Sequence, residues 1–405
     1  MANMRRRFPA CLAAAAVLFG ACSNSDDSGP AAPATPSTAE VTVALGKVQS
    51  SAWILRANLT SLLQEHVFLA GATTATLIAG QDPAPPRAVL DTNSVALSNV
   101  IGAVYGPAGA ARFLELWRLH IGLLVDFAGS SSAGDEAGVT AAKAGLDVYR
   151  EEMATFLNTA NPNLAKEAMS VDQKAYLNGL QSAIGAQAKA DPAAAAKLKS
   201  AAEHMPRTAA VLVAGIAKNH PGVFKGRVDG SASTLRSLLA AKFQEHVYLS
   251  LLATDAILAK GDTKVPVATV DENSVELANV IGSSYGDDAA KQFLALWRAQ
   301  VGSYVDYARA RAGGDAPGAQ AATTKLASEP ARLAAFLHAA NPRLDQAALT
   351  ADLVTHTRSV LSAIDAQSAA APSRFADAHG LAGRSQQMAV RLSTGIVTQF
   401  PARFS

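Results

Sequence analysis

Apolar residues recur at spacings of three and four along most of the chain, and the stretches around them are rich in alanine. Such spacings place apolar side chains on one face of an α-helix, and alanine has the highest helix propensity of the amino acids. No alternating run of β-branched residues is long enough to form a sheet. The pattern therefore predicts an all-α protein.

The first predicted helix has Leu59 and Leu63 on its apolar face and is followed by a proline-rich break at 83–86. A short helix is expected over 92–104, where it ends at a Tyr-Gly step, and a longer one over 108–128. Glycine after a tyrosine is typical of a helix end, because glycine readily adopts positive φ angles.

Three more helix boundaries can be predicted from single residues. Asn161 precedes a proline and should end a helix, because the residue before proline avoids the α region. "SVDQ" at 170–173 resembles a capping box that begins the next helix. Asp191, also followed by proline, should cap the last helix of this half.

The same phrases return in the same order about 180 residues later. "QEHVFL" at 64–69 recurs as "QEHVYL" at 244–249, and "NSVALSNVIG" at 93–102 recurs as "NSVELANVIG" at 273–282. A repeat of this length corresponds to whole domains, because solenoid units are only about 20–50 residues long. The sequence therefore predicts an internal duplication.

The predicted copies cover residues 45–221 and 234–405, with a glycine-bearing linker at 222–233. Four long helices and a short one are expected in each copy. Short loops between them favour antiparallel packing, so the expected architecture is two tandem antiparallel helical bundles.

The N-terminus has the features of a bacterial lipoprotein signal. Three arginines precede an apolar segment that is shorter than the roughly 20 residues needed to span a bilayer, as in export signals. The segment ends in "FGAC", which resembles a lipobox, although Phe19 stands where a leucine is usual. Cleavage after a signal peptide of residues 1–21 would leave Cys22 as the first residue and the only cysteine, ready for acylation with palmitate. A secreted protein cleaved elsewhere is the alternative.

Residues 22–44 contain proline, serine and alanine but little that could be buried, so they are expected to form a disordered tether. Ser23 after the cysteine favours the outer membrane, with the protein facing the periplasm or the cell surface. Thirty-five basic and 33 acidic residues give a net charge of +2 without a basic block, which argues against nucleic acid as a partner.

Histidines are the candidate ligands for a cofactor. His66 and His246, in the repeated "QEHV" phrase, lie among leucines and should point inward. Helical bundles bind metals and haem through side chains on facing helices. A metal or haem site is therefore one interpretation, with the predicted ligands His66, His120 and His204 in the first copy and His246, His356 and His379 in the second.

The alternative interpretation is a buried layer of hydrogen-bonded side chains without a cofactor. At equivalent positions of the two copies, Gln300 replaces His120 and Tyr176 replaces His356, so two identical metal sites are excluded. Such exchanges suit a buried polar layer, in which donors and acceptors must be paired. Glu65 and Glu245, one residue before the core histidines, are expected at the edge of the apolar face.

No Ser-His-Asp arrangement and no glycine-rich phosphate loop can be recognised, so we do not expect an enzyme. The predicted function is that of a membrane-anchored lipoprotein acting as a non-catalytic binding module or as an interaction module for an envelope protein. Metal or haem binding by core histidines is the alternative.

The "QEHV" phrase with its aromatic residue, "WR" followed by "VD" and an aromatic, "FL" before "ANP", and a closing "GI" resemble a family of exported bacterial helical proteins with no established activity. The resemblance covers residues 55–221 and 235–403. It implies a secreted or lipid-anchored helical bundle, and it assigns no binding or catalytic residue.

Overall fold

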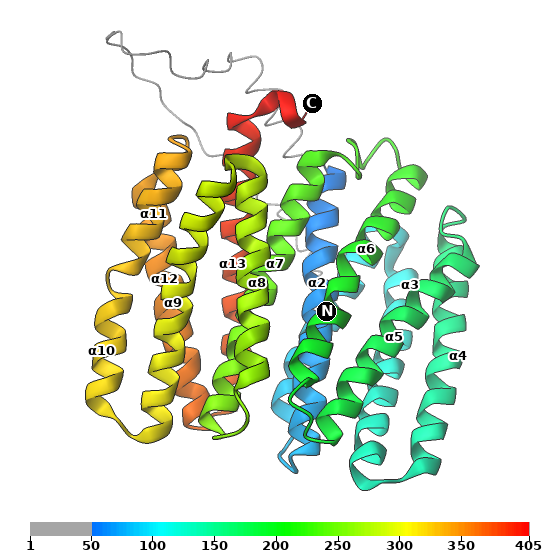
Figure 1. Cartoon of the computed structure of the whole chain (residues 1–405). Coiled ribbons are helices and arrows are strands. Elements are labelled where there is room, and N and C mark those ends of the chain that lie inside the picture. The colour runs from blue at the N-terminus through cyan, green and yellow to red at the C-terminus, as the bar shows by residue number, and fades with distance from the viewer. Residues whose placement is uncertain (1–50, 405) are drawn as a thin grey trace, which may run out of the picture. The chain divides into compact units, whose positions relative to one another are not determined.

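The computed structural model describes residues 51–404, and every regular element in this range is a helix (Figure 1). The predicted all-α fold is confirmed. The predicted signal peptide, the lipidated Cys22 and the tether before residue 45 lie outside the described residues. None of the helices between residues 51 and 404 combines the length and the hydrophobicity that a bilayer span requires.

In the first half of the described chain, each helix is followed by a short connection. The helices are α2 (Ser51–Ile78), α3 (Ala84–Ala133), α4 (Glu136–Ala160), α5 (Lys166–Ala188) and α6 (Ala194–Asn219). The predicted break at 83–86 is shorter than expected, because Pro85 and Pro86 lie within the first turn of α3. Proline is tolerated there, since the first N–H groups of a helix have no partner within it.

The predicted helix end at Gly106 is a sharp kink inside α3. Gly106 has φ 80° and ψ 176°, and Pro107 follows it. The equivalent Gly286, with φ 90° and ψ 170°, separates α8 from α9. Positive φ angles of this kind favour glycine, which explains why a Tyr-Gly step stands at both places.

One other predicted boundary is confirmed, and two are wrong. α4 ends at Ala160, before Asn161. Asp191 does not cap α6, because the helix begins at Ala194 after Ala193 and has no side-chain cap. The Asp191 carboxylate instead accepts a hydrogen bond from the Ala193 N–H at 2.9 Å in the turn before the helix. Ser170 does not begin a helix, because α5 already starts at Lys166. Its hydroxyl instead accepts a hydrogen bond from Arg150 and donates one to Glu151 on α4, so it links two helices.

The second half contains α7 (Ser231–Leu258), α8 (Lys264–Tyr285), α9 (Asp287–Gly313), α10 (Ala316–Leu326), α11 (Glu329–Ala340), α12 (Gln346–Ser368) and α13 (Arg374–Gln399), and ends in the 3₁₀ helix η1 (Pro401–Phe404). Pro330 at the start of α11 divides a segment that is continuous in α4, because proline cannot donate a helix hydrogen bond. The predicted four long helices per half undercount the structure, since α2, α4, α5, α6 and the arm of α3 after Gly106 are all long.

α2 and α7 lie side by side in the middle of the molecule and join the two halves (Figure 1). The Phe68 and Tyr248 rings stack with centroids 4.9 Å apart, and Gln244 donates a hydrogen bond to the Ser61 carbonyl at 3.0 Å. Residues 63–70 of α2 and 243–251 of α7 are all buried. A helix that is covered on every side has no polar edge, which determines the environment of both "QEHV" segments.

Candidate functional site

Glu65 and Glu245 are buried, with exposed fractions of 5% and 0%, and do not lie at a helix edge as expected. The expectation was wrong because each helix is covered by its own half on one side and by the other half on the opposite side. A buried carboxylate needs hydrogen-bond donors or an opposite charge. The two glutamates obtain them in different ways.

Glu65 is held by neutral donors and one imidazole. Tyr248 donates its hydroxyl to Oε1 at 2.7 Å, and Asn93 donates to Oε2 at 3.0 Å. His379 Nδ1 lies 2.8 Å from Oε1, so the Nδ1–H donates to the carboxylate. Tyr248 and His379 belong to the second half, and Glu65 therefore connects the halves. The hydrogen bond to Glu65 raises the pKa of His379, while partial burial opposes the shift.

His379 lines an open groove of about 510 Å³ between α2, α3, α7 and α13. Its side chain is 39% exposed, and no described residue pairs with its Nε2. Asn58, Asn99 and Gln386 add amide groups to the groove, and Arg236 adds a positive charge. A carboxylate that fixes one ring nitrogen and leaves the other accessible prepares the imidazole to bind a ligand.

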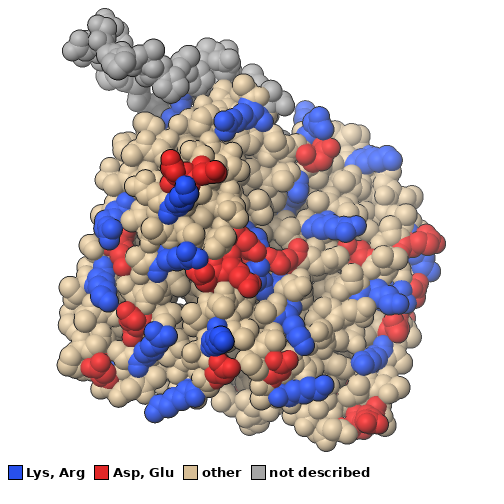
Figure 2. Space-filling model, viewed as in Figure 1, with Lys and Arg blue, Asp and Glu red and all other residues tan. Residues whose placement is uncertain are grey.

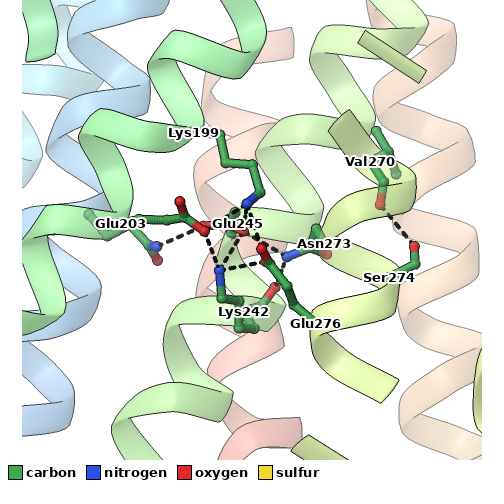
Figure 3. Close-up of polar contacts among 9 residues, drawn as sticks. Lys199, Glu203, Lys242, Glu245, Val270, Asn273, Ser274 and Glu276 are labelled. Carbon is green, nitrogen blue, oxygen red and sulfur yellow. Dashed lines mark hydrogen bonds and ion pairs between the residues drawn. The ribbon is translucent and has the colours of Figure 1, made fainter. Parts of the chain in front are cut away.

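Glu245 is instead surrounded by charges (Figure 3). Lys242 Nζ lies 3.0 Å from Glu245 and also bonds Glu203 at 2.7 Å and Glu276 at 2.6 Å. Lys199 bonds the same two outer glutamates at 2.7 and 2.8 Å. Two ammonium groups and three carboxylates thus form one salt-bridge network, which joins α6 to α7 and α8. On the face of the molecule shown in Figure 2, acidic and basic side chains adjoin one another in the same manner.

Burial raises the pKa of Glu245 to about 7, although Lys242 opposes this shift. Burial alone would lower the pKa of Lys242, but the nearby carboxylates raise it above its ordinary value. Oxygen atoms of Glu203, Glu245 and Glu276 lie within 4.8 Å of one another, close enough to share a metal ion. The two lysines already form ion pairs with these oxygens, so we assign this network to the framework of the protein.

In the first half, two of the three predicted histidines meet in the core. His66 Nε2 lies 3.1 Å from His120 Nε2, which is also 3.2 Å from the Tyr176 hydroxyl. Both imidazoles pack against Trp117, with centroids 4.6 and 4.5 Å away. Burial lowers the pKa of His66 to about 3 and that of His120 well below its ordinary value, so both rings are neutral. His204 lies apart from them on α6, 3.0 Å from Asp172.

In the second half, His246 and His356 are neighbours without a hydrogen bond between them. Their ring centroids are 6.3 Å apart, and both line a cavity of about 80 Å³. Burial lowers the pKa of His246 to about 3 and that of His356 to about 4. Gln300 donates to the Tyr304 hydroxyl at 2.8 Å and to Thr357 at 3.2 Å. The third histidine of each predicted set thus lies apart from the other two. His204 pairs with Asp172, and His379 pairs with Glu65 across the interface.

Comparisons with protein-family models, with curated proteins and with solved structures find no match to this chain. The resemblance to exported bacterial helical proteins therefore stays a prediction. The assignment of a function depends on the residues of this chain and on their geometry.

Proposed function

We propose that the protein is an extracytoplasmic lipoprotein, tethered to an envelope membrane through an acylated Cys22, that acts as a non-catalytic binding module. Its folded part would consist of two helical bundles produced by duplication, with the linker at 222–233 between them. The signal-like N-terminus supports the tether. A Cys22→Ala variant tests the tether. Loss of membrane association would support it, and a variant that stays with the membrane fraction would contradict it.

Contacts that recur 180 positions apart support the duplication. Asn161 donates to the Tyr105 hydroxyl at 3.0 Å, and Asn341 donates to the Tyr285 hydroxyl at 3.1 Å. Two further contacts recur with the same spacing, namely the Arg118–Asp91 and Arg298–Asp271 ion pairs and the hydrogen bonds from Gln187 to Gly71 and from Gln367 to Leu251. Duplicated bundles are the simplest origin of such paired interactions.

The observation that carries the binding role is the open groove beside the Glu65–His379 pair. Its volume of about 510 Å³ lies in the usual range for small-molecule sites, roughly 300–1,000 Å³. When protonated, His379 donates its Nδ1–H to Glu65 and leaves its Nε2–H for an acceptor. Together with the Arg236 guanidinium on the groove wall, it favours a small organic anion as the ligand.

Titration calorimetry of the full chain in detergent, with a panel of small mono- and dicarboxylates, tests this role. We expect saturable binding that falls by about tenfold or more in His379→Ala, because a charged donor is lost. Gly383→Glu should also abolish binding, since it fills the groove with a negatively charged side chain. Glutamate is the residue at the equivalent position, Glu203. His220→Ala, outside the groove, is the matched control. Binding that is unchanged in both groove variants, or absent from the unmodified chain, would overturn the assignment.

Metal binding at His66 and His120 is the second candidate function. Two nitrogen ligands at about 2.0–2.1 Å from a tetrahedral zinc ion lie about 3.3 Å apart, close to the 3.1 Å between the two Nε2 atoms. The Tyr176 hydroxyl would supply a third ligand. The rings are in direct contact with each other, which leaves no space between them for a haem. No carboxylate of residues 51–404 forms a hydrogen bond or an ion pair with them that would offset the charge of a divalent ion, and we therefore rank this function second.

Elemental analysis of the tag-free chain, purified without chelator, distinguishes the two candidates. Stoichiometric metal that disappears in His66→Ala would favour the metal site. A metal-free chain that still binds carboxylates would favour the groove.

A further inference from the structure

A second hollow, of about 800 Å³, opens at the other end of the α2–α7 interface. Its walls come from the C-terminal ends of α2 and α7 and from the residues around the starts of α6 and α13, so both halves contribute. It shares no lining residue with the groove at His379. This hollow is therefore a separate candidate site.

Five charged residues line this hollow, and two of opposite charge, Asp255 and Arg374, form no ion pair with each other. Asp255 projects from α7, and no described residue forms a hydrogen bond or an ion pair with its carboxylate. Arg374, the first residue of α13, also lines the hollow but is too far from Asp255 for an ion pair. Both residues line an adjoining cavity of about 60 Å³ as well, so they stand where the two spaces meet.

The Arg374 guanidinium is fixed in place with unused donors. Its Nη2 donates to Gln81, just after α2, at 3.1 Å, and its Cζ lies 4.7 Å from the Phe375 ring centroid. The buried Nε has no partner among the described residues. A fixed guanidinium with a free N–H is suited to a carboxylate ligand. The Asp255 carboxylate is exposed to the hollow and has no partner among the described residues, so it is available to a cationic group.

The two charges occur on one side of the interface only. The residues 180 positions earlier, Ala75 and Ala194, also line the hollow. Small side chains there leave open the space that faces the charged pair. The flanking Gln187 and Gln367 are already bonded to Thr74 and Thr254, at 2.8 and 2.7 Å, and belong to the framework. Of the other charged residues of the hollow, Asp191 pairs with Lys197 and Arg311 pairs with Asp365, and Asp262 accepts a hydrogen bond from the Lys264 N–H. Asp255 and Arg374 are thus the two groups of opposite charge that a ligand could engage together.

We propose that this hollow binds a small zwitterion of the α-amino-acid class, with its carboxylate on Arg374 and its ammonium group on Asp255. A ligand with both charges satisfies both groups at once, whereas a ligand with one charge leaves the other group unpaired. This site is independent of the anion groove in residues and in ligand class.

Titration calorimetry of the full chain in detergent, with glycine, L-alanine and L-leucine, tests the proposal. Acetate and ethylamine are the singly charged controls. We expect saturable binding of at least one amino acid, and binding of the two control compounds that is weaker by about tenfold or more, because each makes only one of the two charged contacts.

Asp255→Asn and Arg374→Gln should each weaken amino-acid binding by about tenfold or more. Asp262→Asn is the matched control, since Asp262 is another acidic residue of the hollow and an asparagine oxygen can still accept the hydrogen bond from the Lys264 N–H. Ala194→Leu fills the hollow without changing a charge and should also abolish binding. This variant keeps the test valid if either charge variant fails to fold. Lack of amino-acid binding, equal binding of acetate, or binding unchanged in these variants would overturn the proposal.

Discussion

Glu65 and Glu245 are equivalent in sequence and in burial, yet their surroundings differ in kind. Beside Glu245 the chain has Lys242, Glu276, Glu203 and Lys199, and at the four equivalent positions beside Glu65 it has Leu62, Ala96, Gly383 and His379. One side is closed by ion pairs, and the other is an open groove. The same buried carboxylate therefore serves as part of the framework on one side and holds an accessible imidazole on the other.

The difference follows from how each carboxylate is compensated. Hydroxyl, amide and imidazole donors satisfy Glu65 without filling the space beyond them. Lysines have long side chains, and their own charges require Glu203 and Glu276 as further partners. The lysines that compensate Glu245 and their glutamate partners therefore occupy the space that is open beside Glu65.

Among substitutions that test the difference between the two sides, Lys242→Met should have the largest effect on stability. The substitution keeps the aliphatic chain but leaves three carboxylates with one lysine, so we expect a loss of about 3–5 kcal/mol in the free energy of unfolding at neutral pH. His379→Met on the open side should cost only about 1–2 kcal/mol, because Tyr248 and Asn93 still donate to Glu65. Urea unfolding measures both.

Adding Glu245→Gln to Lys242→Met should restore part of the lost stability, since it removes the uncompensated charge. Equal losses in Lys242→Met and His379→Met would mean that the two sides do not differ in the way described.

The next effect is a dependence of stability on pH. The pKa of Glu245 is raised from 4.5 to about 7 in the folded chain. An acid of this kind contributes stability that is present below its unfolded pKa and lost as the pH rises through its folded pKa. Glu245→Gln removes this loss, so the stability of the variant relative to the unmodified chain should increase by about 3 kcal/mol as the pH rises from about 5 to about 8. Urea unfolding at several pH values provides the curve, and parallel curves would contradict the prediction.

The smallest effect is expected for His120→Gln in the core, since Gln300 stands at the position equivalent to His120. His120→Gln should cost about 1 kcal/mol, because an amide can still bond the Tyr176 hydroxyl. His120→Ala should cost about 3 kcal/mol, since it leaves a cavity and unpaired polar groups. Thermal and urea unfolding of both variants compare them. An equally large loss in the two variants would argue against an interchangeable polar layer.

Local signals in the sequence predicted the features that depend on local chemistry. The kink at Gly106 and the end of α4 before Asn161 each depend on the backbone preference of one residue. The inward direction of His66 follows from the apolar face of a single helix. Such features require no knowledge of how the halves meet.

The candidate site could not be predicted in the same way, because its contacts cross the interface. Glu65 meets His379, 314 positions away, and nothing in the local pattern of either helix indicates this contact. Lys199, Glu203 and Glu276 resemble ordinary surface residues on their own helices. The available signal was the set of differences between positions 180 residues apart, since charges in one half stand where small or apolar residues stand in the other.

The most direct test of the open groove is a nuclear magnetic resonance titration of the His379 ring, with and without a carboxylate ligand. The hydrogen bond to Glu65 already raises the pKa of His379, and an anion at Nε2 should raise it further. The account predicts an additional rise in the unmodified chain and none on adding the carboxylate to Gly383→Glu, in which the groove is filled. An unchanged pKa of His379 at saturating ligand would contradict the claim that this groove is the binding site.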